Sequence, residues 1–147
     1  MKVFLDTNIF IEYFAKRSQF TFVKQIFDAI EDGELEGVLS AGSFYTIAYA
    51  MEMELKRQGI HNPEKIQRNR LYLNRVLDLV HVVSASDNMY REAVNDESFH
   101  DIEDSFQYRC AIEAGCDILL TINLRDFRNA NKIRVLCPDD FIKEFYK

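Results

Sequence analysis

The chain has 147 residues, 48% of them hydrophobic, and a formal net charge of −6 at pH 7. This length is sufficient to bury a hydrophobic core, and we expect one domain over residues 1–147. The excess of negative charge argues against broad, nonspecific binding of nucleic acids.

Cysteine usage and the N-terminal residues predict a soluble, cytoplasmic protein without membrane contact. The three cysteines have no metal-binding spacing and are interpreted as buried small hydrophobic residues, a usage that suits a reducing compartment. Asp6 interrupts the N-terminal apolar stretch before a signal peptide could form. The longest uncharged run, residues 37–51, is shorter than the roughly 18–20 residues that span a bilayer.

The first half of the chain alternates short apolar runs with helical periodicity. A strand is predicted over Lys2–Leu5, and a helix near Ile9–Lys16. The further predicted elements of this half are a helix over Phe20–Glu31, a strand at Val38–Leu39, a long helix opened by Ser40 or Ser43 and closed by Gly59, and a helix from Asn62-Pro63 to about Leu77.

The second half continues the same alternation. It predicts strands over residues 79–83, 117–121 and 132–137, a helix over 84–94 capped by Ser84 or Ser86, a helix over 101–115 ended by Gly115, and a helix over 138–147 begun by Pro138. Strands separated by helices predict an α/β fold, a three-layer α/β/α sandwich around a central, mainly parallel five-stranded sheet.

Acidic residues gather where the carboxyl ends of these parallel strands should meet. Asp6 ends the first strand, and Asp126 follows Thr121 at the end of the fourth. The helix before the fourth strand begins with Asp101, Glu103 and Asp104. Ligands of open α/β sheets bind at this edge, so a shared site is expected there.

On this helix we expect Ile102, Phe106 and Cys110 to face the core. We expect Asp101, Asp104, Ser105 and Tyr108 to project from a neighbouring face, with Glu103 pointing further away.

Carboxylates gathered at one place repel one another, and a hard cation such as Mg²⁺ or Mn²⁺ resolves that repulsion. Asn123 could add an oxygen ligand or position a water, while Thr7 and Asn8 could orient Asp6. Simpler roles also fit these acids. Asp6 could cap a helix or form a salt bridge, Asp101 and Asp104 could cap the helix that they begin, and Asp126 could pair with Arg125 or Arg128.

Three segments together resemble the PIN domain, the nuclease fold used by VapC-type toxins of bacterial toxin–antitoxin pairs. They are "FLDTNIFIEYF", "HDIEDSFQYRCAIEAGCDILLTINLRDF" and "KIRVLCPDDFIKEF", and the resemblance runs over essentially the whole chain. It implies a metal-dependent endoribonuclease whose acidic pocket is formed by Asp6, Asp104 and Asp126, with Asn123 beside them. Glu103, the first acid of the "ED" pair, is expected to be a poorer ligand than Asp104.

One position departs from the family pattern. Members usually carry an acid on the helix after the second strand, where this chain has Thr46. Thr46 offers a neutral hydroxyl that could help to place a water. The resemblance therefore supports two hypotheses. One is a Mg²⁺- or Mn²⁺-dependent ribonuclease that could be the toxin of a pair. The other is a catalytically weakened PIN-like module that binds RNA or protein.

Two further segments could form surfaces that bind RNA or another protein. Residues 56–75 carry six basic side chains and one acid, Glu64, which suits either contact with an RNA backbone or a solvated helix face. In residues 45–55, Ile47, Ala48, Met51 and Leu55 form an apolar stripe with Tyr45, Tyr49 and Met53 around it. This apolar surface could belong to the core, to a homodimer seam or to a groove for an antitoxin peptide.

Overall fold

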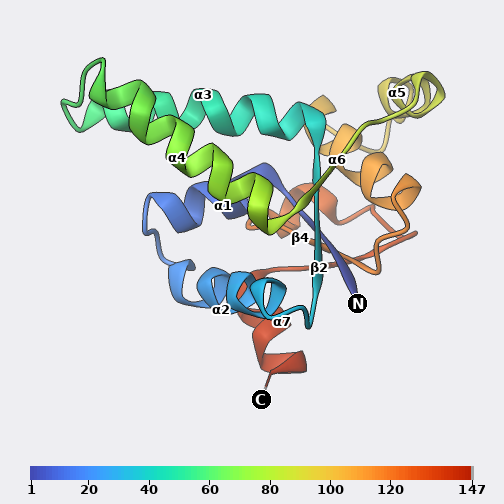
Figure 1. The fold of residues 1–147 in the computed structure, drawn as a ribbon. Helices are drawn as coiled ribbons and strands as arrows, with labels where there is room; N and C mark the ends of the chain where they lie inside the picture. The colour runs from blue at the N-terminus through green and yellow to red at the C-terminus, as the bar shows by residue number, and fades with distance from the viewer. Residues whose placement is uncertain (147) are drawn as a thin grey trace.

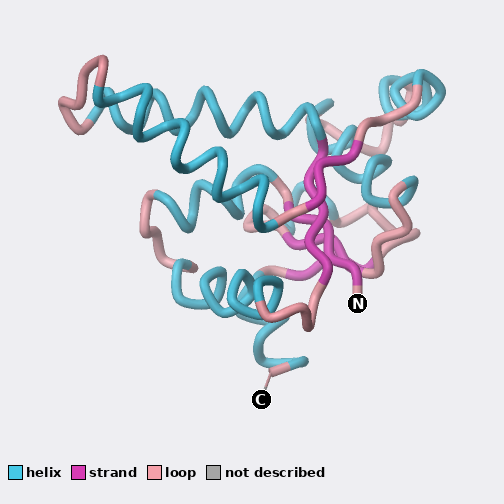
Figure 2. Tube along the Cα trace, viewed as in Figure 1, coloured by secondary structure: helices cyan, strands magenta, loops and turns pink. Residues whose placement is uncertain are grey.

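The computed structural model describes residues 1–146 and contains a five-stranded sheet in which every neighbouring pair of strands is parallel. The strands are β1 (Lys2–Leu5), β2 (Glu36–Ser40), β3 (His81–Val83), β4 (Ile118–Leu120) and β5 (Arg134–Leu136). Their order, β3-β2-β1-β4-β5, places β1 at the centre of the sheet. Figure 2 shows the strands, in magenta, gathered between helices, in cyan.

Helices cover both faces of this sheet, as Figure 1 shows. They are α1 (Thr7–Phe14), α2 (Phe20–Glu31), α3 (Ala41–Arg57), α4 (Glu64–Leu79), α5 (Asp87–Val94), α6 (Ile102–Glu113), the short 3₁₀ helix η1 (Leu124–Phe127) and α7 (Pro138–Phe145). Lys147, the last residue of the predicted C-terminal helix, lies outside the described residues.

The two layers of helices follow from the alternation of side chains along β1. Val3 and Leu5 point to one face and pack with α1, α2, α3, α4 and α7, whereas Phe4 points to the other and packs with α5, α6 and η1. All three side chains are fully buried. The predicted α/β/α sandwich is confirmed.

The structure decides between the alternative helix caps. The Ser40 hydroxyl accepts a hydrogen bond from Ser43 N at 3.1 Å, so Ser40 caps α3. The Ser86 hydroxyl accepts from Met89 N at 3.1 Å and caps α5. Gly59 follows the end of α3, where its φ of 80° is a conformation that glycine adopts without strain.

Two predictions about helices were wrong. The first helix begins at Thr7 rather than near Ile9, because Asp6 caps it. On α6, Ile102 was expected to face the core but is 52% exposed, whereas Cys110 is buried as expected and the neighbouring Ser105 and Tyr108 are buried as well. Ser105 is stable in the interior because its hydroxyl donates to Ala93 O of α5 at 2.8 Å, so the buried face of α6 includes polar residues.

The chain path changes direction at β1. From β1 the chain passes to β2 and β3 on one side, and it later returns to β4 and β5 on the other. In parallel sheets the point where the direction reverses leaves a crevice at the carboxyl ends of the strands. The residues that follow β1 and β4 therefore lie at the position where such folds bind ligands.

Within residues 1–146, the helices do not combine the length and apolar character that a membrane crossing requires.

Gly37 in β2 provides a test of core packing. A Cβ atom at this position would lie 2.9 Å from both Ile30 Cδ1 and Val80 Cγ1, so Gly37→Ala forces buried side chains apart. We expect it to lower the free energy of unfolding by about 1–3 kcal/mol, measured by urea denaturation. Gly42→Ala is the control, because a Cβ there meets nothing within 4 Å. Equal stability of the two variants would contradict this account.

Candidate active site

Asp6 ends β1 as a buried carboxylate with both oxygens hydrogen-bonded. Its Oδ1 accepts from Thr7 N at 2.7 Å and its Oδ2 accepts from the Thr121 hydroxyl at 2.7 Å. Thr121 reaches it because Leu5 pairs with Leu120 in the sheet and Asp6 N donates to Leu120 O at 3.0 Å. The predicted capping role of Asp6 is confirmed, and Asp6 is 5% exposed.

Burial raises the pKa of Asp6 from 3.8 to about 6. The hydrogen bonds from Thr121 and Thr7 favour the ionised form and lower the pKa, but by less than burial raises it. The charge of Glu103 raises it further. Without a cation, the negative charge on Asp6 is therefore destabilised near neutral pH.

Thr121 is held in turn by the segment around it. Its hydroxyl oxygen accepts from Asn123 N at 3.0 Å and from Asn8 Nδ2 at 3.4 Å. The other end of the Asn8 amide accepts from Ile122 N at 3.2 Å. Asn8 thus orients Asp6 through Thr121, and Thr7 does so through its backbone N–H.

Asp104 lies in the first turn of α6, behind the cap formed by Asp101. The Asp101 carboxylate accepts from Glu103 N at 2.8 Å and from Asp104 N at 3.4 Å, which confirms its capping role. Partial burial raises the pKa of Asp104 from 3.8 to about 7, with contributions from the charges of Asp101, Asp6, Asp126 and Glu103. The acids of β1, α6 and η1 therefore share one electrostatic environment.

Glu103 does not point away from this group as predicted. The Thr7 hydroxyl lies 3.4 Å from Glu103 Oε1, and the charge of Glu103 raises the pKa of both Asp6 and Asp104. The prediction failed because α6 is rotated about its axis relative to the expected orientation, which brings Glu103 over α1. Glu103 is thus a further carboxylate beside Asp6.

A buried polar network behind these acids was not found from the sequence. Gln107 Nε2 donates to the Thr7 hydroxyl at 3.2 Å and to the Ser43 hydroxyl, and the Thr7 hydroxyl lies 2.9 Å from that of Ser43. These hydrogen bonds join α1, α3 and α6 directly behind Asp6. Gln107 stands one turn after Glu103 on the same helix face, which was the available signal.

Asn123 and Asp126 lie in the turn that follows β4. Asp126 N donates to Asn123 O at 3.1 Å, and this bond begins η1 and brings Asp126 back toward α6. Both side chains are exposed. The charge of Asp126 reaches Asp104, as its effect on the Asp104 pKa shows.

Thr46 lies in the second turn of α3 and is exposed. Its hydroxyl lies 3.4 Å from Gly42 O in the preceding turn. Thr46 and Glu103 both line a cavity of about 250 Å³ between α3, α5 and α6. Thr46 therefore lies beside this cavity rather than in the hydrogen-bonded group around Asp6.

The donor set suits a cation that keeps part of its water shell. None of Asp6, Asp104 and Asp126 takes part in a salt bridge among the described residues. Their carboxylates are also more widely spaced than a closed site requires. In the part of the chain that the structure describes, only Cys137, Asp139 and Asp140 place three ligand atoms within 4.8 Å of one another. Mg²⁺ typically binds through one or two carboxylates and several waters.

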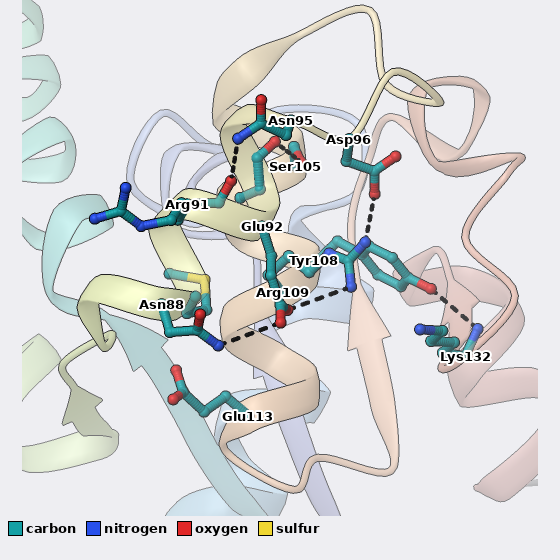
Figure 3. Close-up of polar contacts among 12 residues, drawn as sticks. Asn88, Arg91, Glu92, Asn95, Asp96, Ser105, Tyr108, Arg109, Glu113 and Lys132 are labelled. Atoms are coloured by element: carbon teal, nitrogen blue, oxygen red, sulfur yellow. Dashed lines mark hydrogen bonds and ion pairs between the residues drawn. The ribbon is translucent and has the colours of Figure 1, made fainter.

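An ion-pair cluster holds the segment that precedes α6 (Figure 3). Arg109 of α6 pairs with Asp96 at 2.8 Å and with Glu92 of α5 at 3.8 Å. Ser98 N donates to Asp96 at 3.0 Å, and Asn129 Nδ2 donates to Ser98 O at 3.2 Å. These contacts fix the loop that leads to Asp101 and connect it to the segment after η1.

The basic residues of α3 and α4 lie away from the acids. Helix α3 has 17 residues and is about 25 Å long, and its first turn is the end nearest Asp6. Arg57, Lys65, Arg68 and Arg75 form ion pairs with Glu54, Glu52, Glu64 and Glu31. The predicted RNA-contacting segment is therefore largely charge-paired.

The raised pKa of Asp104 predicts how charge removal affects the ion-free protein. Because its folded-state pKa exceeds 3.8, Asp104 contributes stability below about pH 4 that is lost as the pH rises through about 7. At pH 8 in EDTA, the free energy of unfolding of Asp104→Asn should be about 1 kcal/mol higher than that of wild type, a figure that allows for solvent screening. The difference should vanish near pH 4.

Thermal unfolding at both pH values checks this, with Asp78→Asn as a control, because Asp78 is an exposed acid on α4. If Asp104→Asn were less stable than wild type at pH 8 in EDTA, the conclusion that the neighbouring acids destabilise the charge of Asp104 would be wrong.

Comparisons with known proteins agree with this geometry. A sequence model of the PIN domain family matches residues 2–125. A comparison with curated protein sequences found no match. The fold is similar to that of VapBC2 from Rickettsia felis bound to a promoter DNA fragment, with a TM-score of 0.68, 14% identity, and coverage of 93% of this chain and 98% of that chain.

Two other solved structures are similar. One is a toxin–antitoxin complex from Klebsiella pneumoniae, with a TM-score of 0.63, 21% identity and coverage of 92% of this chain and 97% of that chain. The other is VapC20 of Mycobacterium tuberculosis, a Sarcin-Ricin loop cleaving toxin, with a TM-score of 0.55, 13% identity and coverage of 80% of this chain and 86% of that chain. From the family match and the arrangement of acids at the carboxyl edge of the sheet, the chain belongs to the PIN domain family.

Proposed function

We propose that this protein is a metal-dependent endoribonuclease and the toxin of a toxin–antitoxin pair. The observation that carries this proposal is that Asp6, Asp104 and Asp126 lie close together. The negative charges of Asp6 and Asp126 both raise the pKa of Asp104. PIN-domain neighbours described as toxins, one of them a Sarcin-Ricin loop cleaving toxin, support the choice of RNA as substrate.

In this proposal Asp6, Asp104 and Asp126 hold Mg²⁺ or Mn²⁺, with Asn123 beside them. When bound, such a cation polarises a phosphodiester and lowers the pKa of a water that attacks it. The protein fixes the Asp6 carboxylate in advance through Thr7 N and the Thr121 hydroxyl. That fixed orientation reduces the rearrangement required on binding.

Glu103 compensates in part for the neutral residue on α3. Thr46 supplies no charge, but Glu103 places a fourth carboxylate within reach of Thr7 and close enough to Asp6 to raise its pKa. The negative charge that attracts a cation is therefore retained, although it comes from α6 instead of α3.

A second candidate function is a PIN domain that binds RNA or protein without cleaving it. Two observations favour it: the neutral Thr46 and the wide spacing of the three acids. Cation binding separates the two functions. A cleaving enzyme should be stabilised by millimolar Mg²⁺ or Mn²⁺ in thermal unfolding, whereas an inactive pocket should not respond.

Cleavage of a mixed RNA pool tests the proposed enzyme. We expect cleavage with Mg²⁺ or Mn²⁺, none with EDTA, and a loss of at least about 100-fold in rate for Asp6→Asn and Asp104→Asn, because each removes a charge from the cation site. Asp78→Asn should cleave like wild type. Undiminished cleavage by Asp104→Asn would refute the assignment of the site.

The exposed face of α3 is proposed to contact a second protein. Ile47, Met51 and Leu55 are in the core, but Tyr45 is 81% exposed, Tyr49 66% and Met53 41%, and the three recur at one helix face. Solved neighbours described as VapBC complexes support an antitoxin as partner, and a second copy of this chain is the alternative.

Sedimentation equilibrium distinguishes these partners. If α3 forms a homodimer seam, the wild type should sediment as a dimer and Tyr49→Lys as a monomer, because the charge is unfavourable in an apolar contact. A wild-type monomer would exclude the seam and leave the face for an antitoxin.

A further inference from the structure

The cavity beside the acidic site shares Glu103 with that site and has further features that cation binding does not use. It has a volume of about 250 Å³ and lies between the first turns of α3, helix α5 and helix α6. This is slightly below the roughly 300–1,000 Å³ of sites for drug-sized ligands, so it suits a single planar ring system.

Aromatic and apolar side chains form one wall of this cavity. Tyr90 and Phe106 line it with their rings 5.3 Å apart in an edge-to-face arrangement, and Met89 is buried beside them. Tyr90 is 40% exposed, so part of its ring remains accessible from solvent. Such a wall can stack against a nucleobase, since every base has an aromatic face.

The polar lining favours a ligand that donates hydrogen bonds. Glu103 lines the cavity with a carboxylate, which when ionised only accepts hydrogen bonds. Gln107 also lines the cavity, but its Oε1, unpaired within residues 1–146, is shielded from solvent, so the Glu103 carboxylate is the acceptor that a ligand can reach. A phosphate group is repelled here, because it would meet the Glu103 charge.

The cavity adjoins the site proposed for the scissile phosphate. Glu103 Oε1 lies 3.4 Å from the Thr7 hydroxyl and Gln107 Nε2 donates to the same hydroxyl at 3.2 Å, while Thr7 N donates to Asp6. A nucleotide with its phosphate at the acids could therefore place its base in the cavity.

We propose that this cavity binds the guanine base of the nucleotide next to the scissile phosphate, an inference that rests on the proposed ribonuclease function. Guanine presents two adjacent donors, N1–H and N2–H, that match the Glu103 carboxylate in a bidentate pair. Its O6 can accept from the backbone N–H groups of Ala41 and Gly42 in the first turn of α3, since only that of Ser43 is taken by the Ser40 cap. Uracil presents two carbonyl oxygens, so it matches the acidic lining less well.

Binding of single nucleosides tests the pocket without requiring catalysis. Saturation-transfer NMR in EDTA compares guanosine, adenosine, cytidine and uridine on the intact protein. We expect the strongest signal from guanosine, and binding weaker by about tenfold or more for Tyr90→Ala, because stacking is lost. Val94→Ala is the matched control: it removes exposed apolar atoms one turn further along α5 without lining the cavity.

A second variant keeps the test decisive if Tyr90→Ala unfolds. Gly42 lines the cavity, and a Cβ at this position meets nothing within 4 Å, so Gly42→Leu adds bulk at the cavity without a clash at its Cβ. It should also weaken guanosine binding by about tenfold or more. Equal signals from the four nucleosides, a stronger signal from another nucleoside, or guanosine binding unchanged in both variants would overturn the proposal.

Mapping the cut sites in the RNA pool separates this inference from the proposed function. Active enzyme with guanine enriched beside the cut, and the enrichment lost in Gly42→Leu, supports both. Active enzyme with no guanine preference and no guanosine binding overturns the pocket and leaves the nuclease. Guanosine binding without any metal-dependent cleavage supports the pocket and overturns the nuclease.

Discussion

The hydrogen bond from the Thr121 hydroxyl to Asp6 joins the ends of the central strand β1 and its neighbour β4 at the carboxyl edge of the sheet. It forms because β1 and β4 are parallel neighbours, with Leu5 beside Leu120. A carboxylate this deeply buried is stable only when its oxygens have donors, and Thr7 N provides the second. With Asp6 fixed, α6 and η1 need only direct Asp104 and Asp126 toward the same edge. The acidic site is thus a consequence of strand order and of two short hydrogen bonds.

The features that the sequence predicted well are those set by local patterns. Strand β1 and helix α2 have the predicted bounds, since Val3–Leu5 is a compact apolar run and Phe20, Val23 and Phe27 recur at helical spacing. Parallel strands carry their following residues to one edge, which is why Asp6 and Asp126 could be placed there from topology alone. The environment shared with Asp104 followed from the same reasoning.

The features that were missed depend on how helices pack against one another. Whether Glu103 faces solvent or α1 is set by the rotation of α6, and that rotation depends on buried polar residues such as Ser105 and Gln107. A pattern of apolar residues assigns apolar side chains to the core and polar side chains to the surface. It therefore placed the exposed Ile102 in the core and overlooked the buried Gln107–Ser43–Thr7 network. Contacts among three helices leave no periodic signal in any one of them.

The ion pairs along α3 and α4 also bear on how any nucleic acid would be held. Arg57, Lys65, Arg68 and Arg75 are each paired to an acid, whereas Lys56 and Arg70 form no ion pair among residues 1–146. A phosphate must compete with an acid for each paired cation, so along this surface the affinity should depend less on ionic strength than six basic residues would suggest. Recognition along α3 and α4 then depends more on shape and contacts with bases than on total charge.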